Sequence, residues 1–288
     1  MDQNIEKIKK ILEESKDIVL VSGSEVAKEA GLNGLRAEHM VYDIEAKYGY
    51  SGEEIVTSQI YSRQVALFFD YYKDVILNRE EPLDTTVFDV AAKLEKYGKL
   101  KNIVTRMVYD FYQRAGCENV VELYGSVEEN RCPVCGKIFD SHYIKKAKGT
   151  PKCDACQVIL RPGFSLFGEL IDNARLTRAV DAIEGAGVLL VVGISLNSQA
   201  WQTMLRYYEG DKLILINTEE KNGDERANYC VYGNIADIFK EITDFEFKEE
   251  DRIAAEKERK KAREEAKAKE KAKKEAEEKK KAGAQKNE

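Results

Sequence analysis

Three short runs of apolar residues constrain the fold of this chain more than any other feature of its sequence. The run at 187–193 reads Gly-Val-Leu-Leu-Val-Val-Gly, and the runs at 17–23 and 212–217 repeat the pattern. An uninterrupted apolar run of this length is typical of a strand buried on both faces, as in a parallel sheet with helices on both sides. Runs at 100–105 and 118–123 predict two more strands.

Segments with helical spacing of apolar residues lie between these strands. Helices are expected at 5–16, 86–97, 170–184 and 234–242, and an aromatic-rich helical segment at 53–78. Strands that alternate with helices predict an α/β fold with a doubly wound parallel sheet. Ligands of such folds bind beyond the carboxyl ends of the strands. Here those ends are Gly23, Thr105, Tyr124, Gly193 and Asn217.

Four of the six cysteines form two Cys-x-x-Cys pairs that are 17 residues apart. These four are Cys132, Cys135, Cys153 and Cys156. Four thiolates at this spacing are typical of a tetrahedral Zn²⁺ site, and four protein ligands leave no open coordination position. We therefore expect one structural zinc ion per chain. Cys117 and Cys230 have no partner at metal spacing and are expected to be buried thiols.

Charge is distributed unevenly along the chain. Of its 46 Lys/Arg and 52 Asp/Glu residues, 16 and 12 lie at 248–288, so residues 1–247 keep 30 and 40 and a net charge of −10. An acidic body argues against a nucleic-acid partner, which needs clustered positive charge. The segment 247–288 has almost no large apolar side chain. It is expected to be a solvated single helix or a disordered tail, with a basic interaction tail as the alternative.

Neither a membrane partner nor secretion is expected. No apolar run approaches the roughly 20 residues that a membrane-spanning helix needs. The N-terminal stretch MDQNIEKIKK is charged and lacks the apolar core of a secretory signal. A cytoplasmic location is therefore the expectation.

Several motifs, in order along residues 5–245, resemble those of the sirtuins, the family of NAD-dependent protein lysine deacylases. Thr105 followed by Gln113-Arg-Ala-Gly116 is similar to the frame of the family's TQNID…QRAG segment, and Glu122-Leu-Tyr-Gly-Ser126 is similar to its ELHGS. The four cysteines fit its zinc ribbon. Further matches are Leu160-Arg-Pro162 with Phe167-Gly-Glu169 (LRP…FGE), Gly193-Ile-Ser-Leu196 (GTSL) and Leu215-Ile-Asn217 (the second nucleotide strand).

The resemblance also implies a division of the chain. A sirtuin-type domain would span 1–246, with a Rossmann-like core at about 1–40, 85–127 and 170–246. A helical insert at about 41–84 and a zinc-ribbon insert at about 128–166 would form a small module. The segment 247–288 would follow as a charged tail.

The resemblance implies NAD or ADP-ribose as a ligand besides zinc. In the family, a glycine-rich GAGIS loop approaches the diphosphate, and the histidine of ELHGS acts as general base on the ribose while the acyl group moves to ADP-ribose. The cofactor-binding positions carried over in this way are Gly23, Gly193, Ser195, Asn217, Asn234 and Ile235. Three of them have purely structural alternatives. Gly193 fits the end of any parallel strand, Asn217 fits a turn, and Asn234 fits a helix N-cap.

The chain departs from the family at the loop after the first strand. That loop reads Ser22-Gly-Ser-Glu-Val-Ala27, so Glu25 stands where the family has its second glycine. Two like charges at 4 Å cost about 1 kcal/mol in water and about 4 kcal/mol at an effective dielectric of 20. Diphosphate binding should therefore be weakened unless Glu25 points away.

The chain also departs where the family's chemistry takes place. Arg106, Met107 and Tyr109 replace the Gln, Asn and Asp of TQNID, and Tyr124 replaces the catalytic histidine. A phenol has a pKa of about 10 against about 6.5 for imidazole, so it is almost wholly protonated at pH 7 and is a poor general base. Neither His39 nor His142 is a natural substitute.

Three hypotheses follow. The first is a sirtuin-fold protein with impaired catalysis at Tyr124 that still binds NAD, ADP-ribose or a protein segment. The second is an active deacylase or ADP-ribosyl transferase with rearranged catalytic residues, and the third is a scaffold without a ligand. An acyl-lysine protein or peptide is the expected partner, because the segment 163–169 could add a substrate strand by β-augmentation.

Overall fold

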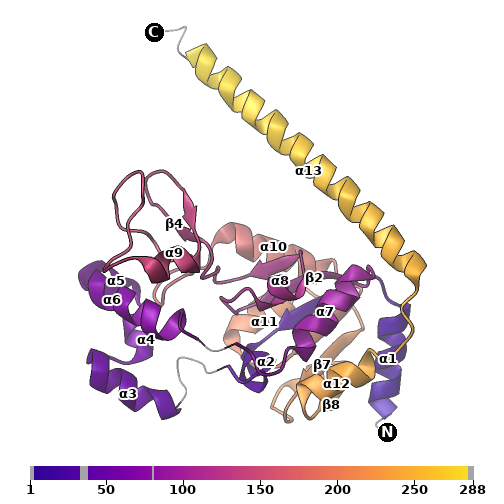
Figure 1. Ribbon diagram of the computed structural model, residues 1–288. Helices are drawn as coiled ribbons and strands as arrows, with labels where there is room; N and C mark the ends of the chain where they lie inside the picture. Colours follow the sequence, from indigo (N-terminus) through magenta and orange to yellow (C-terminus); the bar gives the residue numbers. More distant parts are fainter. Residues whose placement is uncertain (1–2, 33–37, 80, 285–288) are drawn as a thin grey trace.

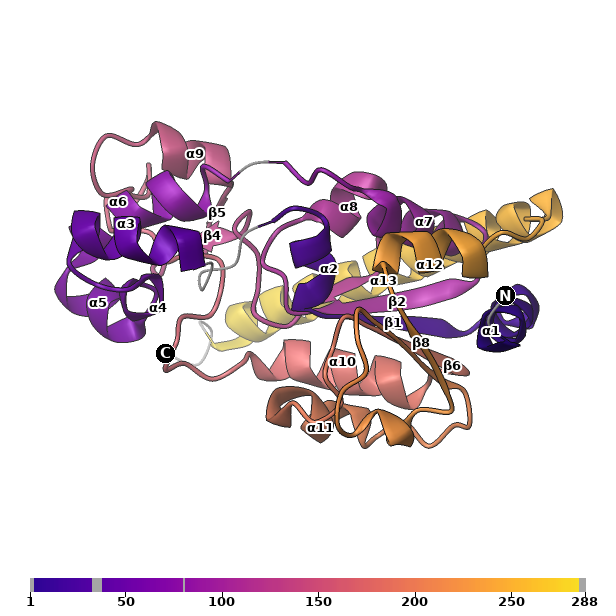
Figure 2. The ribbon, with the colours of Figure 1, turned by 90° about the horizontal axis from the view of Figure 1, so that it is seen from below.

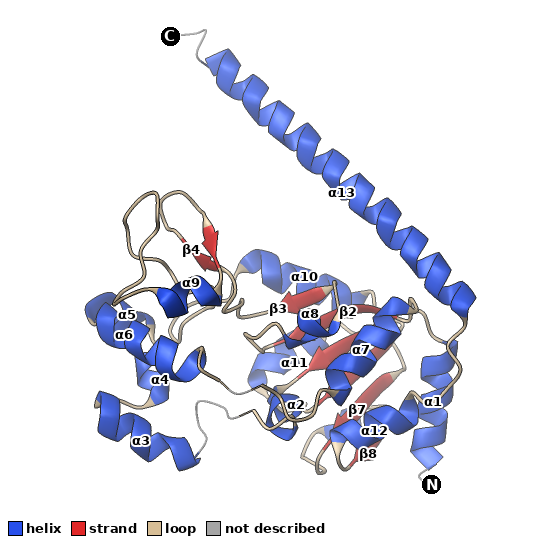
Figure 3. Cartoon of the chain, in the orientation of Figure 1, coloured by secondary structure: helices blue, strands red, loops and turns tan. Residues whose placement is uncertain are grey.

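The computed structural model describes residues 3–32, 38–79 and 81–284, and its main body is built on a parallel sheet of six strands. The strand order is β3-β2-β1-β6-β7-β8 (Figures 1 and 3). The strands are β1 (Ile18–Ser22), β2 (Leu100–Thr105), β3 (Val120–Glu122), β6 (Val188–Val192), β7 (Leu213–Asn217) and β8 (Tyr229–Tyr232). The predicted α/β class and doubly wound sheet are confirmed. β8 was not predicted, because it is a short edge strand without a continuous aliphatic run.

Helices cover both faces of the sheet, as expected from strands that are apolar on both sides (Figure 2). One face carries α1 (Gln3–Glu14), α2 (Ser24–Glu29), α7 (Thr86–Lys96), α8 (Phe111–Ala115) and α12 (Ile235–Ile242). The opposite face carries α10 (Asn173–Glu184) and α11 (Gln199–Leu205). Each face has its own buried apolar cluster, and the strands contribute alternate side chains to the two clusters.

The two inserts pack together into a small module beside the sheet (Figure 1). The helical insert holds α3 (Glu38–Tyr48), α4 (Gly52–Ile55), α5 (Ser58–Arg63), α6 (Val65–Tyr71) and a π-helical turn, η1 (Tyr72–Ile76). The cysteine-rich insert holds β4 (Asn130–Arg131), β5 (Ile138–Phe139) and α9 (Ser141–Lys146). Buried Tyr72 joins them, because its hydroxyl donates a hydrogen bond to Oδ1 of Asn130 at 2.9 Å.

The charged segment near the C-terminus forms one long helix, α13 (Glu249–Ala284), which projects from the body (Figure 1). The expected single helix is thus present, but its first turns are not merely solvated. Ala255 is buried against Gly98, and the guanidinium of Arg259 donates a hydrogen bond to the carbonyl of Lys96 at 2.9 Å. A short 3-10 turn, η2 (Asp224–Arg226), precedes β8. None of the helices described here is long and apolar enough to cross a membrane.

Candidate nucleotide crevice and metal centre

The sheet reverses its strand order between β1 and β6, and two glycines meet at this switch point. The N–H of Gly23 donates to the carbonyl of Val192 at 2.8 Å, and a Cβ at position 23 would lie 2.1 Å from the carbonyl oxygen of Gly193. Gly193 has φ +63°, a left-handed conformation that favours glycine. In doubly wound folds the crevice beyond this point binds ligands. This close backbone contact is by itself a reason for glycine at position 23, independent of any ligand.

Glu25 reaches over Gly193, and its orientation is now defined. A Cβ at position 193 would lie 2.9 Å from Cβ of Glu25, so Glu25 fills the space above that glycine. Its carboxylate turns toward the loop after β7. There Oε1 lies 3.1 Å from Nζ of Lys221, and Oε2 accepts a hydrogen bond from the hydroxyl of Thr218 at 3.2 Å. Neither partner was predicted, because no local pattern marks residues that meet across almost 200 positions.

The predicted cofactor residues at the ends of β6 and β7 lie beside this cluster. Asn217 is wholly buried, and its side chain donates to the carbonyl of Ile194 at 3.0 Å. This hydrogen bond links the end of β7 to the segment that follows β6. Ser195 is partly exposed, and its carbonyl accepts a hydrogen bond from the N–H of Ser198.

The two predicted residues at the start of α12 lie on the face of the sheet that also carries α1, α2 and α7. Asn234 caps the helix, because its side chain accepts a hydrogen bond from the N–H of Asp237 at 2.9 Å. The side chain of Ile235 is buried in the core, and its N–H donates to the carboxylate of Glu29 at 2.7 Å. Burial raises the pKa of Glu29, and the nearby Glu25 carboxylate adds to that rise.

A second cluster lies on the other side of the crevice, where Arg106 follows β2 and Tyr124 follows β3. The guanidinium of Arg106 donates a hydrogen bond to the hydroxyl oxygen of Tyr124 at 3.2 Å. It also lies 5.1 Å from the centre of the Tyr124 ring and 6.0 Å from that of buried Trp201, on α11. Cations are attracted to aromatic faces at such distances. Arg106 thus links Tyr124 to α11, and sequence reasoning missed Trp201 as its partner.

The neighbours of Arg106 are apolar or structural. Met107 is buried in the core of the sheet. Tyr109 stacks on Phe111, packs against the cores of both the sheet and the small module, and donates from its hydroxyl to the carbonyl of Ile76 at 3.3 Å. His142 is exposed on α9 in the metal insert. The side chain of His39 lies outside the described part of the chain.

The segment predicted to bind a peptide, 163–169, is already engaged within the chain. The N–H of Ser165 donates to the carbonyl of Tyr124 at 2.7 Å, and that of Phe167 to the carbonyl of Val56 at 2.9 Å. Gly125 and Gly163 are in close contact, since a Cβ on Gly125 would lie 2.2 Å from the Gly163 carbonyl oxygen. The side chain of Phe167 is 47% exposed.

The four predicted metal ligands come together at one point. Their sulfur atoms all lie within 4.8 Å of one another, and Sγ of Cys135 is 3.8 Å from Sγ of Cys153. A tetrahedron with Zn–S bonds of about 2.3 Å has sulfurs about 3.8 Å apart. The N–H groups of Cys135 and Cys156 point at the first sulfur of their own pair, at 3.5 and 3.4 Å. The cluster suits a structural zinc ion.

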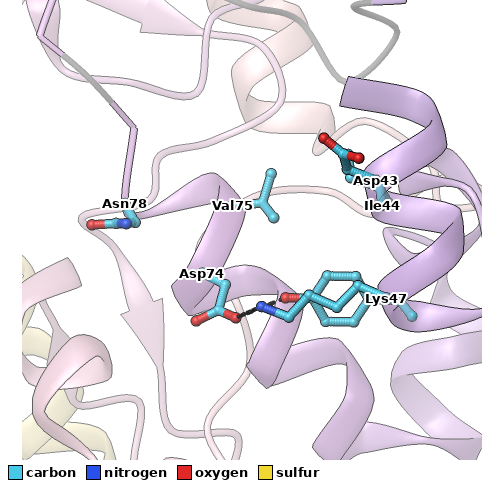
Figure 4. A pocket seen from close by; sticks show the side chains of 7 residues that line it. Asp43, Ile44, Lys47, Asp74, Val75 and Asn78 are labelled. Carbon is cyan, nitrogen blue, oxygen red and sulfur yellow. Dashed lines mark hydrogen bonds and ion pairs between the residues drawn. The ribbon is translucent and has the colours of Figure 1, made fainter. Parts of the chain in front are cut away.

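A cavity of about 420 Å³ lies away from both sites, between α3 and η1 (Figure 4). Its lining includes Lys47 and Asp74, whose side chains form an ion pair at 2.6 Å, and Tyr48, which donates from its hydroxyl to the same carboxylate. Hydrogen bonds from Lys47 and Tyr48 lower the pKa of Asp74. The charges of Lys47 and Asp74 therefore offset each other, and Asp43 contributes a further carboxylate to the lining.

Comparisons with known proteins agree on one family. The family described as "Sir2 family" matches residues 23–200. A protein of Clostridium acetobutylicum named NAD-dependent protein deacetylase is 33% identical over 239 residues, which cover 83% of this chain and 97% of that protein. A solved structure titled as a Sir2 homologue–NAD complex is 28% identical with a TM-score of 0.69, and covers 87% of this chain and 94% of that one. A Sir2 homologue mutant in complex with ADP-ribose is 29% identical with a TM-score of 0.69, and covers 84% of this chain and 95% of its own.

Proposed function

This chain belongs to the Sir2 family, and we propose that it binds NAD or ADP-ribose in the β1–β6 crevice while its own deacylase activity is greatly reduced. The family membership rests on the matched residues 23–200 and on the curated relatives. The proposal is supported by a parallel sheet that matches a Sir2 homologue structure and by a cysteine cluster that suits structural zinc. It is also supported by the side chains at 106, 107, 109 and 124, which differ from those of the family motifs.

The observation that carries the proposed loss of catalysis is the pairing of Tyr124 with Arg106. Tyr124 stands where the family has its general base, and its hydroxyl oxygen accepts a hydrogen bond from a cation. An oxygen that already accepts a hydrogen bond from a guanidinium is a weaker acceptor for a ribose proton. General base catalysis contributes roughly 10²–10⁴ to a rate, so its loss should leave little deacylation.

The residues that would hold nicotinamide support the same proposal. Met107 presents a thioether in place of an amide, and the hydroxyl of Tyr109 already donates a hydrogen bond to the carbonyl of Ile76. Neither side chain offers the paired polar contacts of an asparagine and an aspartate. Release of nicotinamide, the first step in both deacylation and ADP-ribosyl transfer, would therefore lack its positioning groups.

Nucleotide binding is proposed from the donors that remain. Lys221 and Thr218 lie on one side of Gly193, and Arg106 lies on the other side of the crevice. A lysine, a hydroxyl and an arginine are typical phosphate ligands. The related structures hold NAD and ADP-ribose, which makes these two nucleotides the first candidates.

An acyl-lysine segment of a protein is the proposed second partner. The curated relatives are named protein deacetylases, so acetylated proteins are their substrates. In this chain, the exposed Phe167 on the 163–169 segment is the surface on which such a segment would pack. Binding would require the segment to make backbone hydrogen bonds beyond those already formed at 165 and 167.

Two measurements on the full-length protein test the proposal. Calorimetric titration with ADP-ribose and with NAD should show binding, and mass spectrometry of an acetyl-lysine peptide incubated with NAD should show no turnover. Nicotinamide release that Tyr124→Phe abolishes would instead establish an active enzyme with rearranged catalysis. Absence of binding to both nucleotides would leave a scaffold role.

A further inference from the structure

The Glu25–Lys221 ion pair spans the crevice that a nucleotide would enter. Glu25 follows β1, Lys221 follows β7, and β6 lies between these two strands in the sheet. The link therefore passes above Gly193, the glycine at the end of β6. Because Cβ of Glu25 also fills the space over that glycine, the backbone at the switch point is covered by the chain's own side chain.

The contacts of the Glu25 carboxylate are those that a phosphate group would make. One oxygen lies 3.1 Å from the ammonium group of Lys221, and the other accepts from the hydroxyl of Thr218 at 3.2 Å. The side chains of Glu25 and Lys221 are each 25% exposed, so the pair is partly withdrawn from water. A partly buried pair is less screened than a surface pair, and separating it is correspondingly costly.

We infer that the Glu25 carboxylate acts as an internal substitute for a nucleotide phosphate, which a bound nucleotide must displace from Lys221 and Thr218. This inference rests on the nucleotide binding proposed above. It assigns Lys221 as the phosphate-binding cation of the crevice and Glu25 as its competitor. Glu25 is then an autoinhibitory residue, because its carboxylate and the nucleotide phosphate compete for the ammonium group of Lys221.

Competition for one cation predicts a defined pattern of affinities in calorimetric titrations of the full-length protein with ADP-ribose. Glu25→Ala and Glu25→Gln should both bind at least about tenfold more tightly than the wild type, which is about 1.4 kcal/mol. Lys221→Met should bind at least about tenfold more weakly, and it should do so in the Glu25→Ala background as well. Glu219→Gln, which removes an exposed carboxylate of the same loop, is the matched control and should change nothing.

Adenosine, which has no phosphate, is the second control. Its affinity should be the same in the wild type and in Glu25→Ala, because only the phosphate competes with the carboxylate. Thermal unfolding of each variant should show that the fold is retained. Tightening in Glu25→Ala but not in Glu25→Gln, or an equal gain for adenosine, would mean that bulk and not charge blocks the crevice, and would overturn the inference.

The same titrations separate this inference from the proposed function. If the wild type binds ADP-ribose and the Glu25 variants bind it equally well, nucleotide binding stands and the competition is refuted. If only the Glu25 variants bind, the competition stands and binding by the unmodified chain is refuted. If no variant binds, both are refuted.

Discussion

The guanidinium of Arg106 donates a hydrogen bond to the hydroxyl oxygen of Tyr124 at 3.2 Å and lies over the Tyr124 ring, so the two side chains form one unit at the edge of the crevice. A single replacement at position 124 would therefore meet a cation that stays in place. Arg106 is exposed, and its guanidinium also lies 6.0 Å from the centre of the Trp201 ring.

Tyr124→His alone should not restore deacylation. The imidazole would lie beside Arg106, which disfavours the imidazolium that forms when a base takes a proton. The polar groups for nicotinamide would still be missing at 107 and 109. We expect less than about a hundredth of the rate of a relative that has the histidine, measured as deacetylated peptide by mass spectrometry. A rate close to that of the relative would contradict our interpretation of residues 105–109.

Metal analysis should find close to one zinc ion per chain. Cys153→Ser should lose the ion and lower the melting temperature, because the zinc-binding free energy is part of the folding free energy of the small module. Cys230→Ser is the matched control, since Cys230 lies on β8, outside the four-cysteine cluster, and its thiol donates to the carbonyl of Asp224. It should keep the metal. Equal zinc contents in the two variants would exclude the four-cysteine site.

Gln157→Gly should stabilise the metal ribbon. Among the described residues other than glycine, Gln157 alone has a positive φ, at 58°, and it follows its cysteine pair as Gly136 (φ 72°) follows the first pair. A left-handed conformation costs a residue with a Cβ roughly 1–2 kcal/mol, and glycine loses part of this gain through its freer unfolded state. We expect a net gain of about 0.5–1 kcal/mol in urea unfolding, and a loss of similar size for Gly136→Ala. A loss for Gln157→Gly would show that its side chain matters more than its backbone.

Glu122 should make stability depend on pH. Burial raises its pKa from 4.5 to about 7, and the Glu129 carboxylate adds to the rise. A carboxyl group whose pKa is raised in the folded state stabilises the fold fully below its unfolded value, and this contribution is lost as pH rises through about 7. Glu122→Gln removes the dependence. Relative to the wild type, the variant should therefore gain on the order of 3 kcal/mol in free energy of unfolding between pH 4 and pH 8. A difference that stays constant across this range would contradict the assignment.

The sequence predicted the parts of this protein that depend on local pattern. Apolar runs located β1, β2, β6 and β7, and the spacing of four cysteines located the metal cluster. It did not predict the Glu25–Lys221 pair or the contact of Arg106 with Trp201, because side chains that meet at the edge of a sheet come from distant segments without a shared period. Asn217 shows a different limit of sequence patterns. A polar residue at a strand end can be buried in a structural hydrogen bond, here to the carbonyl of Ile194, and need not face a ligand.

The contact of α13 with the body was also beyond prediction, because it buries one small side chain and no apolar stripe. Gly98, with φ +72°, lets Ala255 approach so closely that a Cβ at position 98 would lie 2.9 Å from Cβ of Ala255. Asp251 pairs with Lys16 at 2.8 Å, and Arg263 with Glu118 at 2.6 Å.

The docked turns of α13 should therefore stabilise the body, and the remainder should not. Deletion of 265–288 should leave the free energy of unfolding within about 0.5 kcal/mol of the full chain, because exposed ion pairs of a single helix contribute little to the stability of the body. Deletion of 249–288 should lower the free energy of unfolding by about 1–2 kcal/mol. This deletion removes buried Ala255 and the hydrogen bonds from the Arg259 guanidinium to the carbonyls of Glu95 and Lys96. Gly98→Val should reproduce part of this loss in the full chain, and it should cause a smaller loss in the chain without 249–288, which lacks Ala255. Equal stabilities of the two deletions in urea would show that α13 contributes nothing to the body.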